Sequence, residues 1–211
     1  MIKIENIKVF NIAGAVYSAR NAMNSWHLSD SDLENDRLGE NDLKLAKQLS
    51  KAGTDHSKYL RMITVYMDIT APLYWWKNFS TYKVGTVANS CSTMHTAHKR
   101  DFTLEDFSFE GVEKNFYCNN WQYHNDLLIS DILKHLNKLR RAYLETKDKK
   151  YWYSMIQLLP SSYNQKRTVM LNYQVLKNIY HARKSHKLPE WVCFCEEIKN
   201  LPYFEELCID M

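Results

Sequence analysis

Glycine and proline are scarce in this chain, which has five Gly and four Pro among 211 residues. All-β sandwiches and barrels need many tight turns, and these two residues supply most of them. Their scarcity therefore argues against an all-β fold and favours a fold rich in helix. With 45% hydrophobic and 25% charged residues, the composition is that of an ordinary globular protein. The length predicts a single domain over residues 1–211.

A strong charge of one sign is also lacking. Lys and Arg number 28 against 24 Asp and Glu, which leaves a formal net charge of +4. The basic residues are spread along the chain, and only residues 138–141 and 147–150 form short clusters. Proteins that bind nucleic acids usually concentrate their basic residues on one face or tail. We therefore expect no nucleic-acid partner, and we interpret the two clusters as solvated helix faces and a loop.

Long apolar runs are absent. No apolar segment reaches the 18 residues that indicate a transmembrane helix, so we expect no membrane partner. The first ten residues, MIKIENIKVF, contain no long hydrophobic stretch of the kind found in signal peptides. Together these two observations predict a cytoplasmic protein.

The cysteines show no metal-binding or redox spacing. Their number is odd, no two form a C-x-x-C pair, and they stand at Cys91, Cys118, Cys193, Cys195 and Cys208. We interpret them as reduced thiols, most of which serve the packing of the core. His95 and His98 are three residues apart, but spacing places no third ligand beside them. We therefore expect no metal site.

Hydrophobic periodicity predicts an α+β fold whose second half is rich in helix. Strands are expected at 2–12 and 60–70, and Ser29 or Ser31 is expected to cap a helix that starts nearby. The segment 85–98 is small and polar, and is expected to be an irregular loop that forms a site. Helices are predicted at 17–26, 43–52, 73–82, 126–146, 151–159, 164–185 and 189–201.

The predicted helix 164–185 carries polar side chains on an otherwise apolar stripe. At 100° per residue, Asn172 and Arg183 fall on the same narrow face as Leu176 and Ile179. Burying an amide or a guanidinium without a partner costs free energy. Two interpretations are open. Arg183 either pairs with a carboxylate of the fold or faces a ligand with anionic or carbonyl groups.

These residues resemble the C-terminal part of the flavin-dependent thymidylate synthases, the ThyX family. Across 158–187 the chain matches the family without a gap at Pro160, Asn172, Leu176, Asn178 and Arg183. Upstream, residues 53–57 resemble the family's G-H-x-[ST]-P, and residues 82–95 resemble R-H-R-x-x-S-x-N-x-x-S-x-R-Y. Ser57, Asn89 and Ser92 fall on matching positions of these two motifs. The resemblance therefore covers most of the chain in the same order.

The resemblance implies an antiparallel sheet, an FAD cofactor, a uracil nucleotide as the small-molecule partner and assembly into a homotetramer. It makes Arg183 the catalytic residue that holds and polarises the uracil base. Ser92 and Gln174 are implied to bind the substrate together with Arg183. The residues implied to bind the cofactor are Ser57, Lys83, Asn89, Asn172 and Asn178.

The chain departs from the family where phosphates are held. Tyr82, Val84 and Met94 stand in place of three arginines of the second motif, and Ile156 in place of another phosphate-binding arginine. Lys83 offers a point charge there, which is not equivalent to a bidentate fork. We therefore predict a divergent member of the family, of a phage type, with a degenerate motif.

Three functions follow as hypotheses. The first is methylation of a uracil nucleotide, in the manner of a thymidylate synthase, with hydride transfer from reduced FAD. The alternative is a diverged protein of the same fold that binds or sequesters a nucleotide-type ligand without catalysis. The third is an assembly protein whose aromatic segment 74–79 forms a subunit interface.

Overall fold

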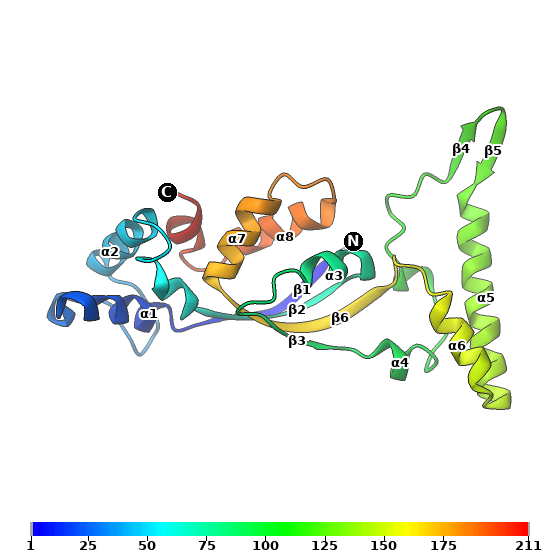
Figure 1. Ribbon diagram of the computed structural model, residues 1–211, viewed down its shortest axis with the longest axis horizontal. Coiled ribbons are helices and arrows are strands. Elements are labelled where there is room, and N and C mark those ends of the chain that lie inside the picture. Colours follow the sequence, from blue (N-terminus) through cyan, green and yellow to red (C-terminus); the bar gives the residue numbers. More distant parts are fainter. Residues whose placement is uncertain (1, 211) are drawn as a thin grey trace. The chain divides into compact units, whose positions relative to one another are not determined.

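One four-stranded antiparallel sheet organises the fold of this protein (Figure 1). It is seen in a computed structural model that describes residues 2–210. The strands are adjacent in the order β1-β2-β6-β3, so that β6 pairs with strands that precede it by many residues. Their bounds are β1 Lys3–Phe10, β2 Thr64–Pro72, β3 Val87–Ser90 and β6 Asn164–Asn172.

Helices supply most of the remaining regular structure. Eight segments are α-helical, and short 3-10 helices connect several of them. The α-helices are α1 Ile12–Ala19, α2 Glu40–Lys51, α3 Leu73–Phe79, α4 Thr93–Thr96, α5 Asn125–Thr146, α6 Lys149–Gln157, α7 Tyr173–Arg183 and α8 Pro189–Lys199. Within residues 2–210, no helix is both long and apolar enough to cross a membrane.

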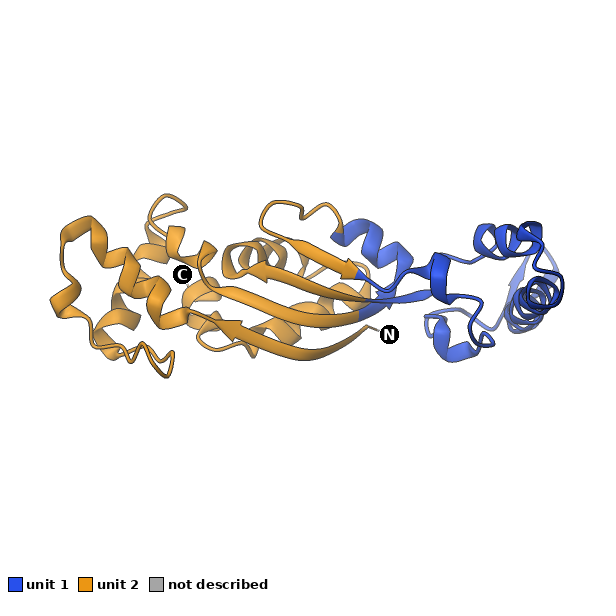
Figure 2. Ribbon diagram, turned by 90° about the horizontal axis from the view of Figure 1, so that it is seen from below, with its two compact units in different colours: residues 1, 70–79, 90–166 blue, residues 2–69, 80–89, 167–211 orange. Residues whose placement is uncertain are grey.

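The chain divides into two compact units (Figure 2). Unit 1 comprises Thr70–Phe79 and Ser90–Lys166, and unit 2 comprises Ile2–Ile69, Ser80–Asn89 and residues 167–210. Strands β2, β3 and β6 each contribute residues to both units. This division does not test the prediction of one domain over residues 1–211, which stays a prediction.

Helix α3 of unit 1 carries three buried aromatic side chains. Trp75, Trp76 and Phe79 of α3 are almost fully buried, and their rings pack on one another at centroid distances of 5.0–5.3 Å. The indole N–H of Trp76 donates to the backbone oxygen of Gln165 at 2.8 Å. The aromatic rings of the segment 74–79 are therefore largely buried within the chain. Its interpretation as a subunit interface is wrong for these three rings, because they are already covered within the chain.

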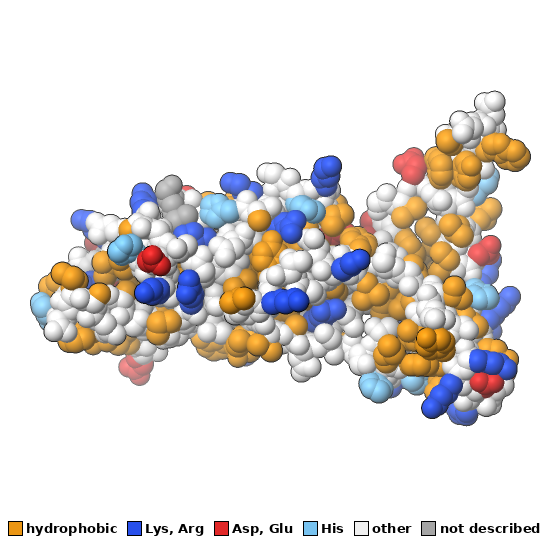
Figure 3. Space-filling model, in the orientation of Figure 1, with side chains coloured by type: hydrophobic (Ala, Val, Ile, Leu, Met, Phe, Trp, Pro, Cys, Tyr) orange, Lys and Arg blue, Asp and Glu red, His pale blue; other side chains and the backbone are white. Residues whose placement is uncertain are grey.

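A hairpin of two short strands carries exposed aromatic side chains in unit 1. Strands β4 Asn115–Cys118 and β5 Trp121–His124 pair in antiparallel register through a turn at Asn119 and Asn120. Both turn residues have positive φ, at 49° and 65°, as a two-residue hairpin turn requires. Apolar side chains gather over this hairpin (Figure 3). Asparagine tolerates the left-handed conformation, so the Asn-Asn pair suits this turn.

Most of the predicted elements are confirmed, with shifted ends. The strand at 2–12 corresponds to β1 and the strand at 60–70 to β2, while five predicted helices correspond to α2, α3, α5, α6 and α8. The helix predicted at 17–26 begins earlier, as α1, and continues as a 3-10 helix over Arg20–Met23. The loop predicted at 85–98 is wrong in part, because β3 and α4 lie within it.

The helix predicted at 164–185 is wrong in its first nine residues. They form β6, where Val169 and Leu171 are buried while Thr168 is exposed, a period of two rather than 3.6. The hydroxyl of Thr168 donates to the carboxylate of Asp68 in the neighbouring β2 at 2.6 Å. Pairing on both sides with β2 and β3 satisfies the backbone groups of this segment, and this tertiary pairing overrides local preference.

The cap predicted for the helix after residue 28 is also wrong. Helix α2 begins only at Glu40, and the backbone N–H groups of Asn41 and Asp42 donate to the carboxylate of Asp30. Ser29 and Ser31 instead donate their hydroxyls to the carboxylate of Asp42, at 2.6 and 2.5 Å. These N–H···carboxylate bonds lower the pKa of Asp30 below its ordinary value.

The buried thiols predict a loss of stability in alkali. Burial raises the pKa of Cys195 and of Cys208 from an ordinary value of 9.0 to about 12. In the unfolded chain both thiols ionise near their ordinary pKa. At a pH above that pKa, the unfolded state therefore binds fewer protons than the folded state. The free energy of unfolding is therefore expected to fall as the pH rises from about 9 to about 12, by at most about 1.4 kcal/mol per pH unit and thiol. Urea denaturation at several pH values measures this, and the slope should shrink in Cys208→Ala.

Candidate functional site

Arg183 ends α7 and contacts two aromatic rings of unit 2. Its Nε–H donates to the hydroxyl oxygen of Tyr82 at 2.9 Å. The guanidinium carbon lies 5.2 Å from the centre of the Trp191 ring and 5.8 Å from that of Tyr82. Both distances are within the range of cation–π attraction. The two rings also contact each other edge to face at 6.0 Å, so cation and rings form one cluster.

No carboxylate pairs with Arg183 among residues 2–210. The guanidinium is half-buried, and its one hydrogen bond to the described part of the chain uses Nε. The two terminal nitrogens therefore have no protein acceptor there. Of the two interpretations open from the sequence, a structural ion pair is thus excluded for the described residues. A partly desolvated guanidinium whose fork is unpaired is suited to a ligand that presents acceptors.

Asn172 begins the helix that Arg183 ends. It is the N-cap of α7, and its side-chain oxygen accepts the backbone N–H of Val175 at 3.0 Å. The predicted stripe of one helix is therefore wrong in detail, since Asn172 closes a strand and caps a helix. The other end of its amide lies beside Gly85, where a Cβ would stand 2.7 Å from Nδ2. Segment 82–85 thus contacts both ends of α7, through Asn172 and through Arg183.

The remaining predicted residues of α7 contact each other. The amide nitrogen of Gln174 donates to the side-chain oxygen of Asn178 at 3.0 Å. Gln174 is buried and its side-chain oxygen has no hydrogen-bond partner among residues 2–210, whereas Asn178 is exposed. Their roles at substrate and cofactor stay predictions.

Ser57, the serine predicted to contact flavin, is enclosed. Only 1% of Ser57 is exposed, and its hydroxyl has no hydrogen-bond partner in the described part of the chain. It precedes the 3-10 helix Lys58–Arg61, against which α7 packs. A cofactor atom would reach this hydroxyl only after a local opening of the segment, so its role also stays a prediction.

Lys83 and Asn89 are exposed and belong to unit 2, whereas Ser92 belongs to unit 1. Ser92 precedes α4, and its backbone oxygen accepts the hydroxyl of Thr96 at 2.7 Å. Unit 2 therefore brings Arg183 and Asn172 to one segment, 82–85. It also contains five of the other six predicted site residues, all except Ser92. Within residues 2–210, no three His, Cys, Asp or Glu side chains form a metal-binding group.

Sequence reasoning missed Trp191 and gave Tyr82 no role at the site. Trp191 stands on α8, beyond the segment that carries the family resemblance, and its ring is fully buried. Arg183 and Trp191 stand on two different helices, and periodicity describes only faces within one element, so it contains no signal for their contact. For Tyr82 a signal existed, because an aromatic hydroxyl stood where the resemblance expects a cation.

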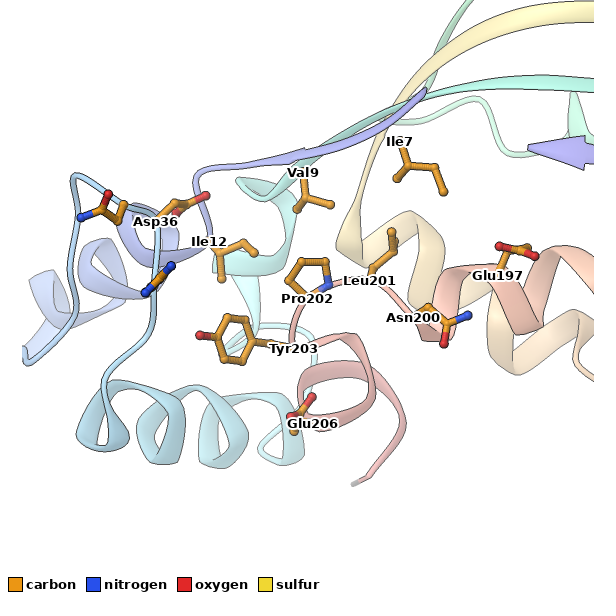
Figure 4. A pocket seen from close by; sticks show the side chains of 12 residues that line it. Ile7, Val9, Ile12, Asp36, Glu197, Asn200, Leu201, Pro202, Tyr203 and Glu206 are labelled. Atoms are coloured by element: carbon orange, nitrogen blue, oxygen red, sulfur yellow. The ribbon is translucent and has the colours of Figure 1, made fainter. Parts of the chain in front are cut away.

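A cavity of unit 2 lies elsewhere in the sequence. It has a volume of about 720 Å³, and none of the predicted site residues lines it (Figure 4). Its wall combines apolar side chains of β1 and of the segment after α8, such as Val9 and Leu201, with acidic ones such as Glu197 and Glu206. The residues that line this cavity are therefore different from the predicted site residues.

Replacing Gly85 by alanine tests the contact between segment 82–85 and α7. Gly85 has φ of 75°, where a side chain costs about 1–2 kcal/mol, and its Cβ would displace the Asn172 amide. We expect a lower thermal midpoint together with a weaker ligand affinity. Gly53→Ala is the matched control, because Gly53 has φ of 107° but open space around its Cβ. Equal losses in both variants would show that only backbone strain matters.

The fold is that of the ThyX flavin-dependent thymidylate synthases. A structure of ThyX from Helicobacter pylori complexed with FAD and dUMP superposes with a TM-score of 0.68 at 17% identity, and covers 99% of this chain and 98% of its own. A second structure of that enzyme with FAD and dUMP gives 0.68 at 18% identity, over 99% and 97%. A UMP/dUMP methylase, PolB from Streptomyces cacaoi, bound with 5-Br dUMP, gives 0.64 at 13% identity, over 98% and 91%. No protein-family model and no curated protein sequence matches the chain.

Proposed function

We propose that this protein binds a uracil nucleotide through Arg183 and methylates it in a ThyX-type reaction that uses FAD. The observation that carries the proposal is the half-buried guanidinium whose terminal nitrogens have no protein acceptor among residues 2–210. The shared fold supports the ligand class, because the similar structures hold dUMP or 5-Br dUMP.

The task of Arg183 is to hold the base and stabilise charge on it. Its two terminal N–H groups present parallel donors, which fit neighbouring acceptors on the edge of a pyrimidine. When the ring is attacked or reduced, negative charge grows on a carbonyl oxygen, and a fixed donor stabilises that charge without reorganisation. The rings of Tyr82 and Trp191 keep water from part of the guanidinium, which strengthens its interaction with the ligand.

FAD would be held by exposed polar side chains, namely Lys83, Asn89 and Asn178, with Asn172 at the start of α7. Reduced FAD supplies the hydride of such a reaction, and methylenetetrahydrofolate supplies the carbon. Lys83 fits a phosphate as a point charge. We propose further that the active protein is a homotetramer in the cytoplasm, to which Ser92 contributes a nucleotide contact.

A second candidate function is nucleotide binding without methylation. Val84 and Met94, which stand where the resemblance expects phosphate-holding arginines, are 91% and 52% exposed. Exposed apolar side chains supply no hydrogen bonds to a phosphate. This observation favours a protein that keeps the base site and has lost part of the phosphate site.

The purified protein tests both functions. Bound flavin would be visible as absorbance near ~450 nm, a property of the cofactor itself. Thermal shifts with FAD, dUMP, UMP and inorganic phosphate then identify the ligand. Stabilisation by FAD and dUMP, with formation of dTMP when methylenetetrahydrofolate and a reductant are added, supports the methylation. Stabilisation by a uracil nucleotide without flavin uptake supports the second function, and no response to any nucleotide contradicts both.

A further inference from the structure

Among residues 2–210, Tyr82 accepts the one hydrogen bond that orients the Arg183 side chain. The donor is Nε–H, the guanidinium nitrogen nearest the helix, and the acceptor is the phenol oxygen at 2.9 Å. A guanidinium is planar, so fixing Nε–H also fixes the plane and direction of both terminal nitrogens. The inference drawn from this contact rests on the proposed function, because it concerns how the same site presents Arg183 to its ligand.

The phenol is itself held in place. Its ring contacts the fully buried Trp191 edge to face, with an angle of 67° between the ring planes. Three residues further along the chain, Gly85 lies close to Asn172, since a Cβ on Gly85 would stand 2.7 Å from Nδ2 of the asparagine amide. Segment 82–85 is therefore fixed against both α8 and the start of α7, and an acceptor carried on it has a defined position.

An arginine at position 82 would not give this arrangement. Arginine has no hydrogen-bond acceptor, so it cannot receive Nε–H, and its charge would repel a second guanidinium at the same distance. Tyrosine is neutral, accepts through its oxygen and adds an aromatic face beside the cation. Tyrosine in place of arginine at position 82 thus removes a charge from segment 82–85 and provides an orienting contact for Arg183.

We propose that Tyr82 is a positioning residue, which holds Nε of Arg183 so that both terminal nitrogens face the carbonyl edge of a uracil-type base. The phenol does not touch the ligand in this role and acts through Arg183. The site then recognises the base. Its affinity for the uracil ring depends on the phenol oxygen, whereas its affinity for phosphate does not.

Titration calorimetry of Tyr82→Phe with dUMP and UMP tests the proposal. Loss of a hydrogen bond to a charged group predicts about ten-fold weaker binding of both nucleotides, at an unchanged thermal midpoint of the free protein. Tyr66→Phe is the matched control, since its exposed ring packs on Phe10 in unit 2 and its hydroxyl has no hydrogen-bond partner among residues 2–210. Equal affinities of Tyr82→Phe and wild type would overturn the proposal while leaving the proposed function intact.

A double-mutant cycle shows whether the phenol acts through Arg183. Lysine has no Nε–H equivalent at that position, so Tyr82→Phe should weaken dUMP binding no further in Arg183→Lys. An additional ten-fold loss in that background would contradict an indirect role.

A measurement without ligand separates this inference from the proposed function. NMR exchange of the Arg183 Nε proton should be slow in the wild type and at least about ten-fold faster in Tyr82→Phe, because the hydrogen bond protects it. If the wild type binds neither dUMP nor UMP, the proposed function fails, and the exchange rates still decide the orienting contact. Identical exchange in both proteins would overturn it.

Discussion

Arg183→Ala is expected to weaken binding of dUMP by at least about 100-fold and to abolish any methylation of it. Two charge-assisted hydrogen bonds are lost, each worth about 1.5–3 kcal/mol. The thermal midpoint of the free protein should change little, because no carboxylate among residues 2–210 depends on this cation and the half-buried Tyr82 can bond to water. Titration calorimetry with dUMP measures the affinity, and product analysis measures the reaction.

Lys184→Ala is the matched control for this variant. Lys184 is the next residue along the chain, is exposed, and carries the same charge at the same end of α7. Its loss should leave the affinity within about two-fold, since exposed charges contribute little. The affinity of Arg183→Lys for dUMP should lie between those of Arg183→Ala and the wild type, because lysine keeps the charge and lacks the forked pair of donors. Similar losses in Lys184→Ala and Arg183→Ala would indicate general electrostatic attraction in place of a specific site.

Asp42→Ala is expected to lower the free energy of unfolding by about 3–5 kcal/mol, the largest effect on stability predicted for this chain. Asp42 is fully buried, and one of its oxygens accepts both Nε and a terminal nitrogen of Arg20 at 2.6 Å. The other oxygen accepts the hydroxyls of Ser29 and Ser31. Alanine would leave a 6% exposed guanidinium without its counter-charge, and buried unpaired charge is costly.

Urea denaturation followed by circular dichroism measures this loss. Asp42→Asn keeps the shape and one acceptor, so it should lose less than the alanine variant and provides a second variant if that one does not fold. Asp131→Asn is the control, because Asp131 makes an exposed pair with Lys134 at 3.6 Å. A change below about 0.5 kcal/mol is expected there. A comparably small change in both Asp42 variants would contradict a structural role for the buried pair.

The local pattern was sufficient for the elements whose partners are near in sequence. Helix α5 has apolar residues at the helical period over its whole length, and its prediction at 126–146 differs from the observed helix by one residue. Pro189 marks the start of α8, where its fixed φ suits the first turn. Such signals depend on the backbone of the segment itself, so they can be read before the fold is known.

The candidate site was predicted only in part, for a physical reason that differs between its residues. Asn172 and Arg183 were found from their place on a predicted helix stripe and from their match to a family pattern, although the single helix proposed to join them was wrong. The acceptor of Arg183 was not predictable, because Tyr82 is 101 residues away in the chain and meets Arg183 only after folding. Whether a guanidinium is paired depends on such distant groups.

The sequence by itself determined the class of fold and the helix-rich second half. These properties follow from composition, from period and from local capping, which act within about one turn of the chain. The tertiary structure decided that residues 164–172 form a strand, because pairing with β2 and β3 satisfies their backbone. It also decided that Arg183 has an aromatic oxygen and no carboxylate beside it, because long-range packing selects which side chains surround a cation.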